Sequence, residues 1–484
     1  MPELFVRPTE FSRPSPRRQR PHGGLGGGTS ALSSSCGNFR ARRQPGAHRH
    51  LDGDEIGELM RLSRRSLFGW LGSAAVSLAL RSPASAEEAS PSVTALPGFT
   101  GPGANPYWNG VNPFVTYPQK LPLLRVTDRA VQLETPRPYF LSPFTPNAAF
   151  YVRYHLELIP NAIDLRTWRL SVEGNVERPL QIAFDDLVKT FRPVSVAAVN
   201  QCSGNSRSRF QPRVPGAQWG NGAMGNALWT GVRLKELLAA ARIRPGTVQL
   251  QFQGLDRGPG PEGKGADVVM KSLDLADPAL DEAVVAYLMN GEPLPMLNGF
   301  PVRLIVPGKF GVYWTKHLAW IRALTREDAN YWMATAYRIP DTPRGNTTPA
   351  DAAGGALKTV PIGHVRMPVR SFIVVPDGSS KLLPGLPVRV QGIAFSGRGP
   401  VVKVEFSEDD GRNWVEATLG GDHGPYSFRT WEHTWTPPRP GRHVLAVRAT
   451  DRTGDVQPDA PVWNPGGYLW NRVERQPLVV GAAS

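Results

Sequence analysis

The sequence predicts an α+β protein with mostly β content, in which a mixed first domain is followed by an all-β, immunoglobulin-like sandwich. Its 484 residues exceed the usual size of one domain, and 48 prolines with 50 glycines argue against a helical bundle. Patterns typical of strands and helices alternate up to about residue 335, whereas strand patterns alone follow residue 365. With 40% hydrophobic and 20% charged residues, the chain can form packed cores.

The first 86 residues are typical of a leader. Residues 1–59 are rich in Arg, Pro, Gly and Ser, and we expect a disordered extension or an over-long gene model there. In 60–86, a basic start precedes an apolar run and the small-x-small pattern of a signal peptidase site. The apolar run is shorter than the roughly 20 residues of a membrane span, so no membrane anchor is expected.

Part of this leader, 63–68 (SRRSLF), resembles a twin-arginine signal, which is a receptor-read address in bacteria. The twin-arginine route exports proteins that are already folded, commonly around a cofactor. We therefore expect a periplasmic protein that carries a cofactor, with 60–86 as its signal peptide.

Half of the net positive charge lies in the leader. The chain carries a formal net charge of +14, and residues 1–86 hold 13 arginines against 6 acidic residues, a net charge of +7. The remaining +7 is distributed over the long mature chain, which is weak support for nucleic-acid binding. We expect no nucleic-acid partner.

Two cysteines, Cys36 and Cys202, restrict the metal chemistry. They allow at most one disulfide and cannot supply a four-thiolate zinc or iron–sulfur site. No C-x-x-C-H motif for covalent haem occurs. If Cys36 leaves with the leader, a mature chain that begins at Glu87 holds a single thiol.

The first domain is expected over 87–360, beginning with a Pro- and Asn-rich ordered arm over 87–120. A short capped helix is predicted at 184–191, and an amphipathic helix follows Thr230 and extends to residue 242. Apolar patterns predict five strands, at 165–174, 194–200, 247–254, 281–291 and 301–308.

A turn-rich connection over 340–365 leads to the second domain, expected over 361–484. Within 401–419, apolar and charged residues alternate, and 409–411 (DDG) predicts a hairpin turn. Short strands at this spacing over about 110 residues are typical of an immunoglobulin-like sandwich. The predicted strands lie within 386–397, 401–419, 427–437 and 443–454.

The segment 200–207 (NQCSGNSR) places Cys202 at the end of a buried strand, in a turn with Arg207 five residues on. A nearby cation and turn amides favour the thiolate, which binds metals or attacks as a nucleophile. A nucleophile needs a histidine base, and the sequence does not show whether His155 or His317 is near. An inert core cysteine, a metal ligand and a nucleophile all remain open on these residues alone.

Several separate motifs occur in one order along the chain. They are 151–156 (YVRYHL), the cysteine segment, 215–234 (PGAQWGNGAMGNALWTGVRL), 252–256 (FQGLD), 299–303 (GFPVR), 306–308 (VPG) with Lys316, and Tyr337. Together they resemble the sulfite oxidase family of molybdopterin enzymes, and most closely its bacterial periplasmic sulfite dehydrogenases. The resemblance covers nearly all of the mature chain.

The resemblance implies a role for eight residues. Cys202 is the expected thiolate ligand of molybdenum, a soft ligand for a sulfur-rich site. Arg153 and Arg207 are expected to bind the substrate anion, because arginine's planar fork fits oxyanions. Tyr337 is expected to hydrogen-bond near the reacting oxygen. The residues expected to hold the pterin and its phosphate are His155, Asp256, Arg303 and Lys316.

The implied activity is molybdenum-dependent oxidation of sulfite to sulfate by oxygen-atom transfer. The expected cofactor is one molybdenum-molybdopterin per chain, without haem, flavin or NAD, and the expected acceptor is a separate c-type cytochrome. The second domain resembles the family's dimerisation module, so a homodimer or a heterodimer with a cytochrome subunit is expected. Two alternatives are a molybdenum enzyme for a protein-bound sulfane or another sulfoxide or oxyanion, and a non-catalytic exported subunit.

Two positions depart from the family's pattern, and no cytochrome b5 domain or haem motif occurs in the sequence. Asn298 stands where many family members have a histidine, and Gly466 stands where animal and plant members have an arginine of the anion pocket. The pattern at 258–263 (GPGPEG) fits the G-x-G-x-x-G spacing of nucleotide-binding loops. Its two prolines argue against the helix start that such a loop needs, which supports the expectation of no NAD binding.

Overall fold

The structure is a computed structural model that describes residues 114–115, 119–121, 123–127, 131–259, 268–460 and 462–482. The extension expected at 1–59 and the signal peptide expected at 60–86 lie outside these residues, and so do Cys36 and most of the arm expected at 87–120. Part of the glycine pattern, 260–263, also lies outside them. The absence of NAD binding therefore stays a prediction.

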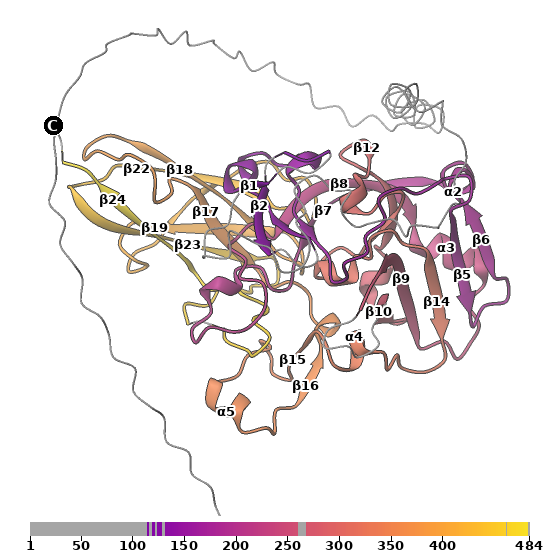
Figure 1. Ribbon diagram of the computed structural model, residues 1–484. Helices are drawn as coiled ribbons and strands as arrows, with labels where there is room; N and C mark the ends of the chain where they lie inside the picture. Colours follow the sequence, from indigo (N-terminus) through magenta and orange to yellow (C-terminus); the bar gives the residue numbers. More distant parts are fainter. Residues whose placement is uncertain are drawn as a thin grey trace, which may run out of the picture. The chain divides into compact units, whose positions relative to one another are not determined.

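Strands predominate in the described residues, and the α-helices between them are short (Figure 1). The predicted α+β class with mostly β content is therefore confirmed. In the part of the chain that the structure describes, no helix is long and apolar enough to cross a bilayer. The α-helices are α2 (Phe184–Thr190), α3 (Leu234–Ala241), α4 (Tyr331–Ala334) and α5 (Pro349–Ala353).

Two mixed-length sheets form the centre of the first domain, and a small sheet of short strands precedes them. The first central sheet has the order β10 (Val268–Asp274), β9 (Gln249–Arg257), β14 (Trp320–Leu324), β5 (Arg169–Gly174) and β6 (Leu180–Ala183). The second has the order β12 (Glu292–Pro293), β11 (Val284–Met289), β8 (Met224–Arg233) and β7 (Pro193–Gln201), with β13 (Arg303–Ile305) also on β11. The small sheet contains β1 (Phe114–Val115), β2 (Leu123–Thr127), β3 (Gln132–Glu134) and β4 (Val152–Arg153).

The second central sheet, whose strand β7 precedes the cysteine, is deeply buried around β11. All six residues of β11 are buried, and Trp229 of β8 packs edge-on against Trp314 at 5.8 Å between ring centroids. A strand that is buried on both faces has a continuous apolar sequence, and the sequence of β11 (VVAYLM) is of this kind. Because β7 of this sheet ends at Gln201, the sheet leads directly into the cysteine segment.

The second domain is a sandwich of two four-stranded antiparallel sheets, as predicted (Figure 1). Its core includes Trp431, Trp435 and Phe406, each nearly inaccessible to solvent. One sheet has the order β17 (Arg370–Val375), β18 (Val388–Phe395), β22 (Arg429–Trp435) and β21 (Thr418–Leu419). The other has the order β20 (Val415–Glu416), β19 (Val401–Ser407), β23 (Gly441–Asp451) and β24 (Glu474–Val480).

The connection between the domains is more structured than predicted. Between residues 338 and 361 it contains α5 and a two-stranded antiparallel sheet. The sheet pairs β15 (Arg338–Pro340) with β16 (Thr359–Pro361). Backbone pairing between residues so far apart in the sequence leaves no local pattern, so the sequence reads as turns throughout.

The amphipathic helix predicted after Thr230 begins later than expected, at Leu234. Thr230–Arg233 continue β8: the first three residues pair with both β7 and β11, and Arg233 pairs with β11. The backbone groups of these four residues are therefore used in the sheet, and a tertiary interaction overrides the local helical pattern. The predicted strands and the helix at 184–191 match β5, α2, β7, β9, β11 and β13 within a few residues, but the predicted cap of α2 is wrong because Ala183, which precedes the helix, makes no side-chain capping hydrogen bond.

Replacing Gly231 with alanine tests how closely β8 and β11 pack against each other. A β-carbon there would lie 2.1 Å from the carbonyl oxygen of Val285 and 2.5 Å from Cα of Ala286. Gly231→Ala should lower the free energy of unfolding by about 1–3 kcal/mol, because backbone atoms must move apart. Urea unfolding measures it, and Gly378→Ala, which meets no atom within 4 Å, is the control. Equal stability of the two variants would contradict the predicted packing.

Candidate active site

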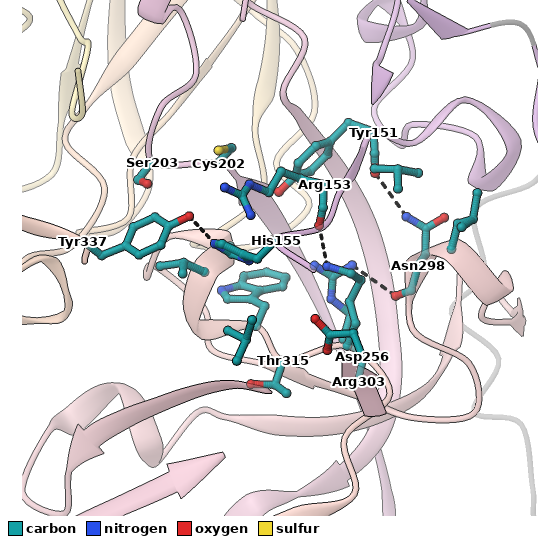
Figure 2. Close-up of a pocket in the computed structure, with 17 residues that line it drawn as sticks. Tyr151, Arg153, His155, Cys202, Ser203, Asp256, Asn298, Arg303, Thr315 and Tyr337 are labelled. Atoms are coloured by element: carbon teal, nitrogen blue, oxygen red, sulfur yellow. Dashed lines mark hydrogen bonds between the residues drawn. The ribbon is translucent and has the colours of Figure 1, made fainter. Parts of the chain in front are cut away.

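Seven of the eight predicted site residues line one cavity next to the end of β7 (Figure 2). The cavity encloses about 670 Å³ of empty space, including its open mouth. The seven residues are Arg153, His155, Cys202, Asp256, Arg303, Lys316 and Tyr337. The eighth, Arg207, does not line the cavity and lies behind it.

Cys202 directly follows β7, and its thiol is free and almost fully buried. Its backbone N–H donates to Ala223 O at 2.9 Å, and its carbonyl accepts from Asn205 N at 3.0 Å. The Asn205 side chain in turn accepts from Ala223 N at 3.0 Å. These hydrogen bonds hold the cysteine segment against the start of β8, so the thiol has a fixed position on the cavity wall.

Residues 220–222, which hydrogen-bond to the cysteine segment, are held in turn by a buried carboxylate. Glu134 accepts hydrogen bonds from the backbone N–H groups of Gly220 and Gly222, at 2.9 and 2.6 Å. Burial raises the pKa of Glu134, and the two backbone donors oppose that shift. Because Glu134 comes from β3, a strand far away in the sequence fixes the return of the chain toward β8.

The sandwich domain supplies the second contact to this segment. Arg370 of β17 donates from Nη2 to Ser206 Oγ at 2.5 Å and to Asn221 Oδ1 at 2.9 Å. Glu474 of β24 accepts from Asn221 Nδ2 at 3.0 Å and from Arg209 Nη2 at 2.7 Å. We call these five residues the interdomain clamp. The clamp ties both sides of the cysteine segment to the second domain.

The cavity is rich in positive charge and in donors without partners. Arg153, Arg303 and Lys316 line it against one carboxylate, Asp256. Arg153 Nη1, Arg303 Nε and the hydroxyl of Ser203 are buried, and none of the three has a hydrogen-bond partner. Leaving such groups unpaired costs free energy, so the arrangement fits an occupant that is anionic and rich in acceptors.

Lys316 and Asp256 have shifted pKa values with a common cause. Burial, together with Arg303, lowers the pKa of Lys316 to about 7. Burial also raises the pKa of Asp256, which Lys316 partly opposes. Lys316 Nζ donates to Arg153 O at 2.6 Å and lies 4.1 Å from the centre of the Tyr154 ring. An anion bound here would restore the full charge of Lys316 near neutral pH.

His155 and Tyr337 form a hydrogen bond between Nε2 and the hydroxyl (Figure 2). Burial, followed by the charge of Arg153, lowers the pKa of His155 well below its usual range. Burial raises the pKa of the Tyr337 phenol. Both groups are therefore neutral near pH 7, and the pair can orient a bound oxyanion without adding charge. Tyr337 also has φ +59°, a strained value that persists where the surroundings require it.

Arg207 lies one aromatic ring away from the cavity. Its guanidinium donates to Ala217 O at 3.2 Å and to Gly466 O at 3.0 Å, and lies 5.3 Å from the centre of the Tyr468 ring. Tyr468 stacks on Tyr337 with ring centroids 5.6 Å apart. The ring of Tyr468 therefore separates the charge of Arg207 from Tyr337 on the cavity wall. The sequence did not predict a role for Tyr468, because its contacts are with residues distant in the sequence.

Asn298 and Gly466, the two positions that depart from the family pattern, both make close contacts in the structure. Asn298 is buried, accepts from Lys120 Nζ and donates to Tyr151 O at 3.2 Å. Burial lowers the pKa of Lys120 well below its usual range. At Gly466, a β-carbon would lie 2.4 Å from the ring of Tyr468. Any larger residue at 466 thus requires that ring to move.

The histidines do not support a nucleophilic cysteine. His317 is buried, its Nδ1 bonds Phe300 O at 2.6 Å and its Nε2 bonds the Tyr154 hydroxyl at 2.7 Å. Burial lowers the pKa of His317 to about 3, so it is neutral, and Nδ1 must donate to the carbonyl. Across the described residues, no histidine hydrogen-bonds to the Cys202 sulfur.

Two family models match the chain. They are the oxidoreductase molybdopterin binding domain over 155–332 and the Mo-co oxidoreductase dimerisation domain over 363–477. The mitochondrial sulfite oxidase of Rattus norvegicus is 33% identical over 384 residues, which cover 75% of this chain and 68% of that protein. The chain belongs to the sulfite oxidase family. This member is therefore a molybdopterin oxidoreductase, as the sequence motifs implied.

Relatives of this sulfite oxidase family member differ in the reactions that their names state. The NADH nitrate reductase 1 of Oryza sativa subsp. japonica is 31% identical over 348 residues, 68% of this chain and 37% of that protein. The sulfane dehydrogenase SoxCD of Paracoccus pantotrophus has a similar structure, with a TM-score of 0.62. It is 24% identical, and the match covers 74% of this chain and 88% of that one, so it supports the shared fold.

The cavity residues fit the cofactor that the family binds. A molybdopterin offers a phosphate and many acceptors, and the unpartnered Arg303 Nε with Lys316 can bind such groups. The free thiol of Cys202 is a suitable protein ligand for molybdenum, which here would be bound mainly by sulfur. We therefore expect Cys202 to hold the metal, and Arg303, Lys316, Asp256 and His155 to hold the pterin.

Neutralising Glu474 tests the interdomain clamp. Glu474→Gln leaves Arg209 without its buried ion-pair partner and removes the nearby negative charge that favours the charged form of Arg370, so the free energy of unfolding should fall by about 1–3 kcal/mol. Thermal unfolding of the purified protein measures the loss. Glu416→Gln makes the same chemical change at an exposed position on β20 and should leave stability unchanged. Equal stability of the two variants would mean that the clamp does not stabilise the fold.

The lowered lysine pKa values predict a rise in stability with pH. Burial lowers the pKa of Lys271, as of Lys316, to about 7. Between about pH 7 and the usual lysine pKa near 10.5, the unfolded chain binds more protons, so stability rises with pH. Each lysine adds up to about 1.4 kcal/mol per pH unit.

This pH dependence is measured by urea unfolding of the cofactor-free protein at pH 7 and 8.5. Lys271→Met should flatten the rise, whereas Lys235→Met, at an exposed position in α3, should not. A slope in Lys271→Met that equals the wild-type slope would refute the assignment. Using the cofactor-free protein matters because a bound anion would raise the pKa of Lys316.

Proposed function

We propose that the protein oxidises sulfite to sulfate, with a c-type cytochrome as electron acceptor. The observation that carries the proposal is the juxtaposition of a buried free thiol, Cys202, with a cavity whose donors lack acceptors. Sulfite is a small anion that matches the positive charge of this cavity. The sulfite oxidase relatives support the choice of substrate.

Oxidation of sulfite adds one oxygen atom from water and releases two electrons and two protons. The bound molybdenum cofactor supplies the oxygen-transfer and electron-accepting chemistry. Arg153 binds the anion through its unpartnered Nη1, and Arg207 adds positive charge from behind Tyr468. Tyr337, which is held by its hydrogen bond with His155, orients the oxyanion.

The proposal extends to the cellular setting. The twin-arginine pattern at 63–68 supports export to the periplasm, where c-type cytochromes are available as one-electron acceptors. The match to a dimerisation domain over 363–477 supports a dimer, either with a second copy or with a cytochrome subunit. Both arrangements place the acceptor outside this chain.

One observation favours a second candidate, oxidation of a protein-bound sulfane or of another sulfur compound. Gly466 leaves the anion pocket without the arginine that animal and plant members have there, so binding of a small dianion has less support. A panel of sulfite, thiosulfate and a persulfidated carrier peptide, each assayed with cytochrome c reduction, separates the two. Faster turnover of the persulfide would select the second candidate.

The primary test is sulfite-dependent reduction of cytochrome c by protein purified from a host that makes molybdopterin. Cys202→Ala should abolish turnover, with a loss of at least about a thousandfold, because the metal loses its protein ligand. Arg153→Gln should raise the KM for sulfite about tenfold or more. Elemental analysis reports molybdenum in each preparation, and thermal unfolding confirms that each variant is folded.

The outcomes of this test separate family chemistry from substrate. Molybdenum without sulfite turnover would refute sulfite as the substrate and leave the molybdopterin assignment intact. Near wild-type turnover in Cys202→Ala would refute the ligand assignment. Ser195→Ala, a small change at an exposed position on β7, is the matched control and should retain activity.

A further inference from the structure

A second cavity lies between the end of the first domain and the sandwich. It encloses about 680 Å³ of empty space, including its mouth, and shares no lining residue with the active-site cavity. Its polar lining consists of Arg344, Arg366, Arg398, Asp455 and Asn471, and apolar residues complete the wall. Its walls therefore come from the interdomain connection and from several sandwich loops.

The charges of this second cavity are not balanced. Three arginines face one carboxylate, so the lining has a net charge of +2. Asp455 is shared: Arg398 Nη1 lies 3.0 Å from its Oδ2, and Arg344 Nη2 lies 3.8 Å from its Oδ1. Arg366 has no carboxylate within 4.0 Å among the described residues. Its hydrogen bond, from Nη1 to Pro307 O, is long at 3.4 Å.

The position of Arg366 depends on a glycine. A β-carbon at Gly308 would lie 2.8 Å from Arg366 Nη1 and 2.4 Å from the carbonyl oxygen of Gly397. Gly308 also has φ +82°, which favours glycine, so the backbone leaves room for the guanidinium there. Arg366 is half-buried, and its location is set by packing between the two domains.

We propose that the second cavity binds a tetrahedral oxyanion, with the chemistry of sulfate or hydrogen phosphate. The guanidinium of Arg366 provides the unpaired charge, and Arg398 and Arg344 reach the same space while held by Asp455. Planar guanidinium groups bind such anions with two parallel hydrogen bonds. Asn471 is buried and adds an amide, whose bond to Val369 O is long at 3.4 Å.

The anion completes the charge balance of the second cavity. A dianion neutralises the +2 of the lining, and Val365, Pro368 and Leu469 form an apolar part of the same wall. Elsewhere on the sandwich, Arg389 is paired one to one with Glu432. The excess of guanidinium groups distinguishes this cavity from an ordinary surface ion pair.

The test is isothermal titration of the full-length protein with sodium sulfate and, separately, with sodium phosphate. Potassium chloride at equal ionic strength corrects for screening. All titrations use the Arg153→Gln background, which weakens anion binding in the active-site cavity. Arg366→Gln should weaken the remaining binding at least about tenfold, because charge-assisted hydrogen bonds are lost.

The matched control is Arg442→Gln, which removes the same charge from an exposed position on β23. It should leave the affinity unchanged, and thermal unfolding without added anion confirms that both variants are folded. Comparison of the sulfate and phosphate arms identifies the preferred anion. Equal affinities in Arg366→Gln and Arg442→Gln, or no binding once Arg153 is replaced, would overturn the proposal.

Discussion

The site depends on buried charges that cross the boundary between the two domains. Arg370 and Glu474 belong to the sandwich, yet they hydrogen-bond to the segment that carries the cysteine. Buried ionic groups contribute little net stability but are costly to separate, so they favour one arrangement over its neighbours. Besides matching a dimerisation domain, the sandwich therefore also stabilises the active-site region of the first domain. It fixes the part of the chain that carries Cys202.

The charges and unpaired donors of the active-site cavity favour an anionic ligand. Without such a ligand, Arg153 and Arg303 keep buried donors unpaired, and Lys316 loses proton affinity. These are free-energy costs of the empty protein that an anionic cofactor and substrate remove. Cofactor binding and folding stability are therefore coupled. This coupling agrees with export after folding, which the twin-arginine pattern predicts.

Sequence patterns predicted the features that depend on neighbouring residues. The five strands predicted in the first domain, the four strand segments predicted in the second and the segment around Cys202 follow from local periodicity and motif order, whereas β8, β10, β14, β17 and β24 were not predicted. The family motifs also selected seven residues that meet in one cavity, although they span positions 153 to 337. Contacts between distant segments could not be predicted. The clamp, the contact of Lys120 with Asn298 and the stacking of Tyr468 on Tyr337 join segments whose pairing no local pattern records.

Gly466 and Tyr468 illustrate how such contacts restrict sequence change. A side chain at 466 would occupy the space of the Tyr468 ring, and that ring separates Arg207 from Tyr337. The effect of a mutation at one position therefore depends on the residue at the other. Exchange of glycine for arginine at 466 therefore requires either a shift of the Tyr468 ring or a change of residue 468. Because both adjustments alter the packing between Arg207 and Tyr337, substitutions at 466 and 468 are expected to be correlated among relatives.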